Sequence, residues 1–376
     1  MSTVGDVFAL IRRRRDITRT EIGQVTGLSR TAVSARVASL AAQGLVVESE
    51  QAPSTGGRPA TLLSFNADAG VVLSAAIGRS RTRLAVCNLA GDVLDLTDID
   101  QQPELGPDDL MPDVVKRLDA LLASHRGAHV YGVGASLPGT VDRTRGASLD
   151  SPILPGWDGV ELQTYFRELT DAPVVVDNDV NVIALAEKHS AVDDMLVLKA
   201  STGIGTGIIA GGALQRGAMN AAGELGHNKT PAAAGLPCRC GDTGCLEAVA
   251  GGWALVTALR EDGKPVSHLR DVVALAHSGD ADARRMIRDS GRHVGEVLAA
   301  AVNLLNPAVL VVAGDMSGGY DIFVAGLRET LYGNATALAT RTLQVVPSTY
   351  GDRSGVIGCA TMILDEVLSA GAIDRL

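Results

Sequence analysis

The chain has 376 residues, a formal net charge of −10 and 46% hydrophobic residues, and this length predicts two or three domains rather than one small core. The acidic balance excludes a protein whose whole surface attracts nucleic acid. No run approaches the roughly 18 apolar residues of a membrane span, and the first ten residues lack the charged-then-apolar order of a signal peptide. We therefore expect a cytoplasmic protein with no membrane partner.

Basic residues gather at the start of the chain. Residues 1–60 contain eight arginines against five acidic residues, so the remaining chain carries a net charge of −13. An amphipathic helix is expected over residues 4–13, and the capping-box spacing of Thr18 and Glu21 predicts the start of a second helix. Ser29 is expected to cap a third. Short helices joined by a tight turn predict a helix-turn-helix within a basic head.

A β-wing is expected after these helices. Apolar runs at residues 45–50 and 61–65 flank a Gly- and Pro-rich loop, which makes the head an α+β winged helix-turn-helix. In this motif the third helix enters the major groove of DNA, here with Val33, Val37 and Leu40 turned inward, and the wing tip can reach the minor groove. Five residues are therefore expected to contact DNA: Arg30, Thr31, Ser34 and Ala35 of the helix and Arg58 of the wing. The alternative is a three-helix domain that mediates protein contacts.

Beyond the head, apolar runs alternate with helical patterns, which is typical of α/β proteins. The run at residues 173–177 is expected to form a strand that delivers Asn178 and Asp179 to its carboxyl end, where α/β folds gather polar ligand groups. The stretch 201–207 is expected to form a glycine-rich loop. Other strands are expected at 71–77, 82–89, 130–135, 195–199 and 309–314, and helices at 108–124, 180–188 and 321–332.

Three of the five cysteines and one histidine crowd into a short glycine-rich segment. Three thiolates and one imidazole form the ligand set of a closed tetrahedral structural zinc site. A disulfide framework is disfavoured because three clustered cysteines leave one unpaired. The remaining two, Cys87 and Cys359, lie in apolar runs and are expected in the core. Glu224 and Glu247 flank the cluster and are suited to hold a polar ligand. The expected metal ligands are His227, Cys238, Cys240 and Cys245.

Several short motifs resemble the ROK family of repressors, open reading frames and sugar kinases, and the resemblance covers essentially the whole chain. They are Leu154–Trp157 (LPGW), Asp177–Asn181 (DNDVN), Thr202–Gly205 (TGIG), Glu224–His227 (ELGH) and the Cys-rich loop through Glu247. The resemblance implies an actin-like, ribonuclease H-like two-lobed sugar-kinase fold. It divides the chain into a winged-helix domain at 1–66, a small lobe at 67–180 to which 360–376 return, and a large lobe at 181–359 with the zinc loop and an oligomerisation surface.

The resemblance also implies roles for the cleft residues. In the family's kinases, the aspartate that matches Asp179 takes the proton from the sugar hydroxyl that attacks ATP. The residues that match Asn178, Glu224, His227 and Glu247 hold sugar hydroxyls. From the chemistry alone, a carboxylate can accept two hydroxyl protons, and a metal on one nitrogen of His227 leaves the other N–H free to donate. All five positions are intact, which predicts a retained sugar pocket.

The phosphate side departs from the family pattern. Kinases of the family begin the body with Asp-x-Gly-Gly-Thr, whereas this chain has Ala76-Ile77-Gly78-Arg79-Ser80, without the aspartate and with Arg79 where glycine allows close approach to phosphate. A second glycine near the nucleotide is replaced by Asp315, which repels phosphate. We therefore expect no enzymatic activity and a vestigial base at Asp179.

The favoured hypothesis is a sugar-responsive transcriptional regulator that represses a carbohydrate-utilisation operon. Its partners would be operator DNA and a sugar or sugar phosphate, and the two half-sites of an operator predict a homodimer or homotetramer. Two alternatives remain: an active sugar kinase with a DNA-binding head, and a regulator that senses a partner protein. The identity of the sugar and the direction of its effect on DNA binding are left open.

Overall fold

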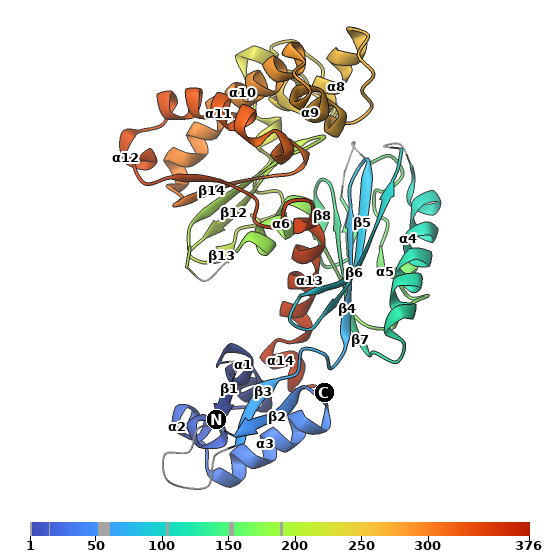
Figure 1. Ribbon diagram of the computed structural model, residues 1–376, viewed down its shortest axis with the longest axis vertical. Helices are drawn as coiled ribbons and strands as arrows, with labels where there is room; N and C mark the ends of the chain where they lie inside the picture. The colour runs from blue at the N-terminus through green and yellow to red at the C-terminus, as the bar shows by residue number, and fades with distance from the viewer. Residues whose placement is uncertain (1, 15, 52–60, 103–104, 150–153, 189–190) are drawn as a thin grey trace.

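The computed structural model describes residues 2–14, 16–51, 61–102, 105–149, 154–188 and 191–376. Three bodies follow one another along its long axis (Figure 1). A small head lies at one end together with both chain termini, a first five-stranded sheet lies in the middle, and a second five-stranded sheet with most of the helices lies at the far end. This arrangement agrees with the α/β fold class and the preceding winged helix that the sequence predicts.

Three helices and a three-stranded sheet form the head. The helices are α1 (Val4–Arg14), α2 (Arg19–Thr26) and α3 (Arg30–Ala42). Thr18 caps α2 and forms the expected capping box with Glu21, while the Ser29 hydroxyl accepts the amide of Ala32 at the start of α3. These caps satisfy amides that lack intrahelical partners, so the helix starts could be located from sequence.

The wing is built from β2 (Val46–Gln51) and β3 (Thr61–Phe65), which pair antiparallel with Val46 opposite Phe65. A third strand, β1 (Asp16–Thr18), pairs with β3 on its other side and was not expected. The expected wing tip, including Arg58, falls at 52–60 and lies outside the described residues.

The first sheet of the body has the strand order β10-β7-β4-β5-β6. Its strands are β4 (Val71–Ile77), β5 (Arg81–Asn88), β6 (Val93–Asp100), β7 (Val130–Leu137) and β10 (Val174–Asn178). Helix α4 (Pro107–Leu122) packs on one face, and α13 (Ser354–Val367) packs on β4 and β7 from the other. The sequence reading missed β6, because this edge strand carries three aspartates and is half exposed, so its apolar pattern is weak.

The second sheet has the order β13-β12-β11-β14-β15. Its strands are β11 (Met195–Ala200), β12 (Ile204–Ala210), β13 (Ala213–Leu214), β14 (Val309–Ala313) and β15 (Gln344–Pro347). The expected glycine-rich loop at 201–207 is wrong in extent: only Ser201–Gly203 are loop, and Gly205 and Gly207 lie within β12. Glycine at position 207 lets α6 (Asp179–Glu187) approach, since a Cβ on Gly207 would lie 2.6 Å from the Ala184 Cβ.

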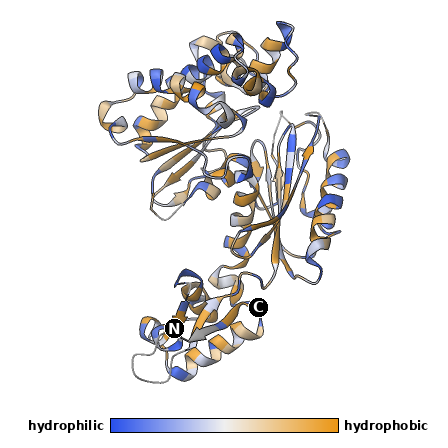
Figure 2. Cartoon of the chain, viewed as in Figure 1, coloured by the Kyte–Doolittle hydropathy of each residue, from blue (hydrophilic) through white to orange (hydrophobic). Residues whose placement is uncertain are grey.

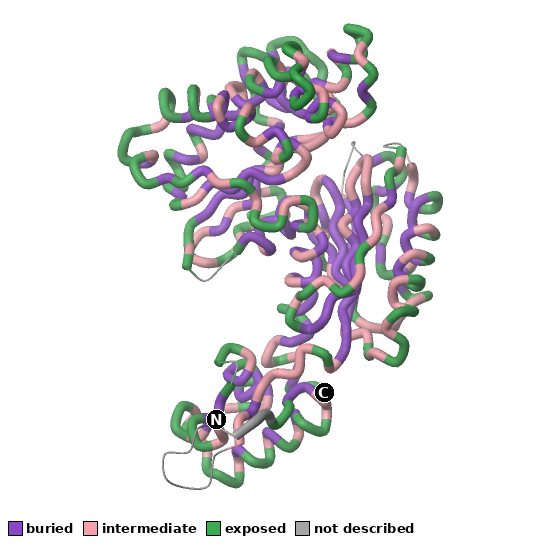
Figure 3. The backbone as a smooth tube through the Cα atoms, in the orientation of Figure 1, coloured by how far each residue is buried: buried purple, intermediate pink, exposed green. Residues whose placement is uncertain are grey.

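Buried residues follow the two sheets and the helices packed on them (Figure 3), and hydrophobic residues concentrate along the same elements (Figure 2). Cys87 and Cys359 are both fully buried, as expected. The larger helices over the second sheet are α8 (Gly252–Glu261), α9 (Leu269–His277), α10 (Ala281–Leu305) and α11 (Tyr320–Asn334). The shorter elements are β8 (Val141–Asp142), β9 (Ala147–Ser148), α5 (Gln163–Phe166), α7 (Glu247–Ala250), α12 (Ala337–Thr340) and α14 (Ala370–Ile373), with 3₁₀ turns at Ala123–His125, Leu225–His227, Pro231–Ala233, Asp315–Gly319 and Gly351–Arg353.

The head shares a hydrophobic core with the first sheet. Side chains of the head such as Phe8 and Leu63 belong to the same buried cluster as Val72 of β4 and Ile363 of α13. The contact is close: a Cβ on Gly5 of α1 would lie 2.0 Å from the Ala370 carbonyl oxygen of α14. The Gly5 amide also donates to Asp374 at 2.8 Å. The head is therefore packed against the C-terminal helices over an apolar surface.

Candidate ligand cleft and metal centre

A cleft of about 230 Å³ opens between the two sheets of the body. The five sequence-predicted sugar residues all line it, from three separate parts of the chain. Strand β10 ends at Asn178 and α6 begins at Asp179, the 3₁₀ turn Leu225–His227 carries His227 directly after Glu224, and α7 begins at Glu247. The fold thus gathers residues up to 69 positions apart around one cavity, at the carboxyl end of a strand where α/β folds place polar ligands.

Asn178 caps helix α6, in addition to any role toward a ligand. Its side-chain oxygen caps α6 by accepting the amides of Val180 and Asn181, and its nitrogen donates to the Gly139 carbonyl oxygen at 2.7 Å. One amide hydrogen remains for the cavity, since a primary amide carries two donors.

Asp179 is engaged by a lysine that the sequence reading did not single out. Lys199, on β11, donates from Nζ to Asp179 Oδ2, and the two side chains are only 22% and 15% exposed. Both residues line the cleft. The ammonium group therefore pairs with the carboxylate that the sequence predicts as a vestigial base. A lysine in an otherwise apolar strand, MLVLKA, was the available signal.

Glu247 is almost fully buried and both of its oxygens are held. Oε2 accepts the Ile204 amide at 2.9 Å, and Oε1 accepts the indole N–H of Trp253 at 3.1 Å. Trp253 follows on α8, and Arg239 lies over its ring at 4.7 Å from the centroid. These contacts fix the carboxylate orientation within the cleft and leave its remaining lone pairs for hydroxyl donors.

Glu224 and His227 meet on the metal side of the cleft. Glu224 Oε2 lies 3.8 Å from His227 Nε2. Burial raises the pKa of the Glu224 carboxyl, the nearby His227 lowers it, and the neighbouring Asp179 and Glu247 carboxylates raise it further. The carboxylates of Glu224, Asp179 and Glu247 thus gather on one side of the cleft, where they can accept hydrogen bonds from a ligand rich in hydroxyl donors.

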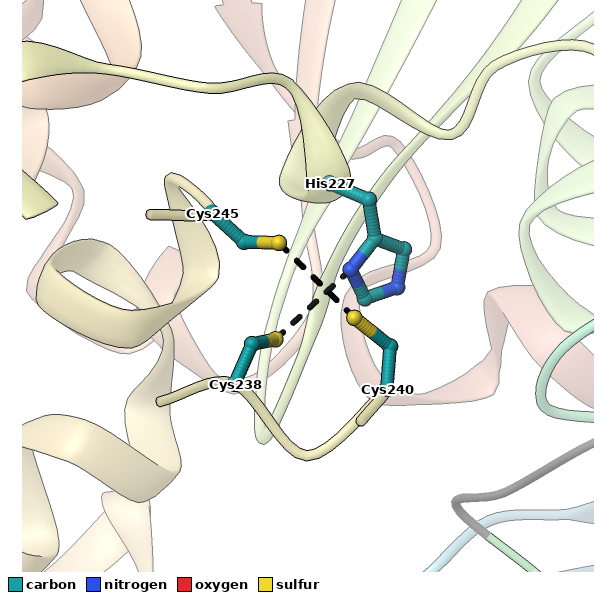
Figure 4. Close-up of side chains that lie close together, drawn as sticks. All are labelled: His227, Cys238, Cys240 and Cys245. Carbon is teal, nitrogen blue, oxygen red and sulfur yellow. Dashed lines mark hydrogen bonds between the residues drawn. The ribbon is translucent and has the colours of Figure 1, made fainter. Parts of the chain in front are cut away.

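His227 turns its other nitrogen toward three cysteines (Figure 4). The four expected metal ligands lie with one atom each within 4.8 Å of one another, with 3.7 Å between His227 Nδ1 and Cys238 Sγ and 3.7 Å between Cys240 Sγ and Cys245 Sγ. A tetrahedron with metal–sulfur bonds of about 2.3 Å places its sulfurs about 3.8 Å apart, whereas a disulfide needs about 2.05 Å. The residues therefore fit a tetrahedral metal ion.

A second layer of contacts surrounds this cluster. Lys229 donates from Nζ to Cys245 Sγ at 3.2 Å, to Asp242 Oδ2 at 2.6 Å and to the Thr243 carbonyl oxygen at 2.7 Å. Burial raises the pKa of the Cys238 thiol to about 12, so this thiol needs a cation nearby to ionise. A charged group donating to a ligand sulfur is typical of metal sites whose ligands are held in place.

Residues 76–80, where the sequence predicts a departure from the kinase phosphate motif, end β4 and enter a tight turn, and ion pairs hold the strand after it. The Gly78 amide donates to the Arg81 carbonyl oxygen at 3.0 Å. Arg81 pairs with Asp100 and with Asp352, and Arg83 pairs with Asp98 at 2.6 Å. The Arg83 guanidinium, donating to Asp98, lowers the pKa of that carboxyl. These arginines are therefore neutralised by acidic residues of the same protein.

Asp315, the second expected departure from the kinases, lines the cleft at the start of its 3₁₀ turn. It accepts the Ser201 hydroxyl at 2.5 Å, so it holds the loop before β12.

The four expected DNA-contacting residues on α3 are exposed: Arg30, Thr31, Ser34 and Ala35. Val33, Val37 and Leu40 are buried beneath them, as the helical period predicts. Arg36, on the same helix, instead donates to the Ser2 and Ala32 carbonyl oxygens. Within the part of the chain that the structure describes, no helix has the length and apolar character needed to cross a membrane.

Comparison with known proteins gives two family matches. Residues 72–366 match the model of the ROK family, and residues 3–57 match a model of the MarR family. The xylose repressor of Caldicellulosiruptor bescii is 28% identical, over 96% of this chain and 95% of its own. A solved ROK family transcriptional regulator, a homologue of the E. coli MLC protein, shares 27% identity with a TM-score of 0.79 and covers 98% of this chain and 96% of its own.

A kinase structure matches a smaller share of the chain. The ROK family glucokinase of Streptomyces griseus, solved with glucose and AMPPNP, shares 27% identity with a TM-score of 0.66, over 78% of this chain and 99% of its own.

Proposed function

This chain belongs to the ROK family, and from that premise we propose that it is a sugar-responsive transcriptional repressor. The observation that carries the proposal is one continuous buried cluster that joins the winged-helix head to helix α13, whose first residues line the ligand cleft. A head that reads DNA and a cleft suited to hydroxyl-rich ligands are thus parts of one packed unit. The whole-length similarity to a xylose repressor supports the same function.

In this proposal the head, residues 1–66, binds operator DNA through α3 and the wing. The exposed Arg30, Thr31, Ser34 and Ala35 would meet base edges and phosphates, and Arg58 would serve the wing. The match of residues 3–57 to the MarR family supports a DNA-binding head. We assign 67–180 and 360–376 to a small lobe and 181–359 to a large lobe, with the cleft between them.

The cleft would hold a saccharide through the five residues Asn178, Asp179, Glu224, His227 and Glu247. Carboxylates accept pairs of hydroxyl protons, and the His227 Nε2 hydrogen would donate to a sugar oxygen. The Cys and His cluster supports a structural Zn²⁺ held by His227, Cys238, Cys240 and Cys245. Zinc on Nδ1 would fix the tautomer that leaves Nε2 protonated and aimed at the cleft. The ion would therefore stabilise the loop that carries Glu224 and Glu247.

We further propose that the body is no longer a kinase. Lys199 engages Asp179, and the replaced motif Ala76–Ser80 lacks the aspartate that would help to hold a metal–nucleotide complex. Asp315 adds a negative charge on the expected phosphate side. A base that is paired with an ammonium group, with no phosphate clamp beside it, has neither the free carboxylate nor the electrophile that phosphoryl transfer requires.

The same structure suggests how ligand binding reaches the head. Helix α6 starts at Asp179 in the cleft and ends at Glu187, a carboxylate that is only 3% exposed. Glu187 accepts the Ser348 hydroxyl at 2.5 Å, the Thr349 amide at 3.0 Å and the Ser354 hydroxyl at 3.3 Å. These three residues lead into and begin α13. A shift of α6 would therefore be passed to α13.

Helix α13 is too tightly packed to absorb such a shift. A Cβ on Gly358 would lie 1.8 Å from the Val182 carbonyl oxygen of α6, so the two helices touch along their backbones. At its far end α13 leads to α14, which is bonded to α1 of the head through Asp374 and Gly5. Because packed elements move as units, saccharide in the cleft would reposition the recognition helices. Coupling is reciprocal, so operator DNA would weaken saccharide binding by the same factor.

We place this activity in the cytoplasm, with the protein binding two operator half-sites as a homodimer or homotetramer. A repressor of sugar use must leave its operator when the sugar is present, so the saccharide would weaken DNA binding. The test is a shift assay on DNA upstream of the protein's own coding sequence, with and without a saccharide panel. Operator binding that no saccharide alters would contradict the proposal, and so would the absence of DNA binding.

A further inference from the structure

A second cavity, of about 610 Å³, lies beside the cleft. Its lining comes from the first sheet on one side and from helices over the second sheet on the other. The end of β6 and the residues after it, through Gln102, form one side. Helix α8 forms the other side, with Trp253, Thr257 and Arg260 along one face. This interlobe groove and the cleft share Ser80 and Thr202 as lining residues. The two cavities therefore adjoin at these residues.

The groove resembles the cleft in its suitability for a polar, ring-shaped ligand. It offers an indole ring, an amide at Gln102, a hydroxyl at Thr257 and a guanidinium at Arg260, all groups that hydrogen-bond to hydroxyls or pack on the apolar face of a sugar ring. Its one carboxylate among the described lining residues, Asp100, pairs with Arg81 and, at 2.9 Å, with Arg270 of α9. That last ion pair joins the two sides of the groove.

Trp253 lines the groove and contacts a residue of the cleft. Its backbone amide donates to the Thr202 carbonyl oxygen at 3.1 Å, and its indole N–H donates to Glu247 at 3.1 Å in the cleft. The Arg239 guanidinium, which also lines the groove, lies over the indole ring, and in sequence Arg239 stands between two of the expected metal ligands. A ring in the groove would thus touch the residue that orients the main acidic acceptor of the cleft.

Size favours a ligand that uses both cavities. The cleft alone, at 230 Å³, is smaller than the roughly 300–1,000 Å³ of typical small-molecule sites, whereas the groove falls within that range. We propose that the effector is a saccharide of at least two rings, with the first ring in the cleft and the second in the groove against Trp253. This inference rests on the proposed function and specifies the class of its ligand.

Calorimetric titration of the full-length, metal-loaded protein tests this proposal. The probes are xylose, glucose and N-acetylglucosamine, each paired with disaccharides that contain it: xylobiose, cellobiose, maltose, sucrose and diacetylchitobiose. We expect at least one disaccharide to bind about tenfold or more tightly than its own monosaccharide, the effect of one or two added hydrogen bonds and an apolar contact.

Two variants separate the groove from the cleft. Thr257→Trp fills the groove and should bring the disaccharide affinity down to that of the monosaccharide, whereas Thr257→Val, the matched control, should preserve the preference. Trp253→Phe keeps a ring but loses the N–H to Glu247, so it should weaken mono- and disaccharide binding by a similar factor.

Three outcomes would overturn the inference. The first is a monosaccharide that binds as tightly as every disaccharide. The second is a preference for the disaccharide that persists in Thr257→Trp. Tight binding of ATP or inorganic phosphate that Thr257→Trp abolishes would assign the groove to an anion instead. The first two results leave the proposed function intact if any saccharide binds, whereas binding of no saccharide at all would remove the proposed function itself.

Discussion

Lys199 of β11 and Asp179 of α6 form an ion pair inside the ligand cleft, between the strand of the second sheet and the helix that follows the first. Its two side chains are mostly shielded from water, so neither charge has a full solvation shell to return to. Removing one partner leaves the other poorly solvated, which is more destabilising than removing both.

This pairing makes a prediction for a double-mutant cycle. Lys199→Met and Asp179→Asn should each lower the free energy of unfolding, and the double variant should be more stable than the sum of the two predicts, by about 1–3 kcal/mol. Urea unfolding of the four proteins measures the coupling. Strict additivity would mean that the two side chains do not interact in solution.

The Cys and His cluster predicts that Cys240→Ser loses its metal and its response to saccharide. A hydroxyl is a poor replacement for a thiolate in a tetrahedral site, so the loop from His227 to Glu247 should loosen, with a drop in thermal stability and in saccharide affinity. Elemental analysis should find about one zinc per chain in the parent protein and far less in the variant.

The control for that experiment is Cys87→Ser, at a buried cysteine of β5 outside the cluster. It should lower stability but keep its metal, because its thiol has no part in the site. An unchanged metal content in Cys240→Ser would contradict the assignment.

Glu187→Gln should uncouple ligand from DNA. The substitution keeps the shape of the side chain but turns one acceptor oxygen into a donor group, so contacts to the segment before α13 are lost. We expect saccharide and operator affinities, each measured alone, to stay within about threefold, while the ratio of operator affinities without and with saccharide falls toward one.

Glu261→Gln, at an exposed position at the end of α8, is the matched control and should retain the full ratio. Normal coupling in Glu187→Gln would mean that the ligand signal does not pass through this carboxylate.

Arg30→Ala should weaken operator binding by about tenfold and leave saccharide binding unchanged, since Arg30 lies at the exposed start of α3. Fluorescence anisotropy with labelled operator measures the affinity for DNA, and calorimetry measures the affinity for saccharide. Arg285→Ala, an exposed arginine on α10 that lies far along the chain from the head, serves as the charge-matched control. An equal loss of operator affinity in both variants would mean that the effect comes from the change in net charge and not from a contact of Arg30 with DNA.

Local patterns carried much of the prediction from sequence. The helix starts of the head could be located because Thr18 and Ser29 satisfy backbone amides within three residues of themselves, and such caps are local. The four members of the Cys and His cluster could be named because three of them lie within eight residues of one another. The five cleft residues rested on the resemblance to a known family.

What the sequence left out depends on contacts between distant segments. Strand β1 is only three residues long and owes its existence to its pairing with β3, 46 residues later. The partner of Lys199 lies 20 residues away across the cleft, and Trp253 was passed over because an isolated tryptophan gives no sign of the carboxylate it holds. The predicted extent of the loop before β12 was wrong because glycines are typical of loops. Here Gly207 lies within the strand and allows α6 to approach it.

We propose that a saccharide in the cleft controls how tightly the head binds DNA, without phosphoryl transfer. The most direct measurement is the anisotropy of labelled operator DNA bound to the metal-loaded protein, titrated with the saccharide that binds most tightly by calorimetry, with ATP and Mg²⁺ either present or absent. We predict that the saccharide lowers operator affinity by about tenfold or more, equally in both conditions and with no phosphorylated sugar formed. An operator affinity that stays constant as the cleft saturates, or a response that requires ATP turnover, would contradict the account.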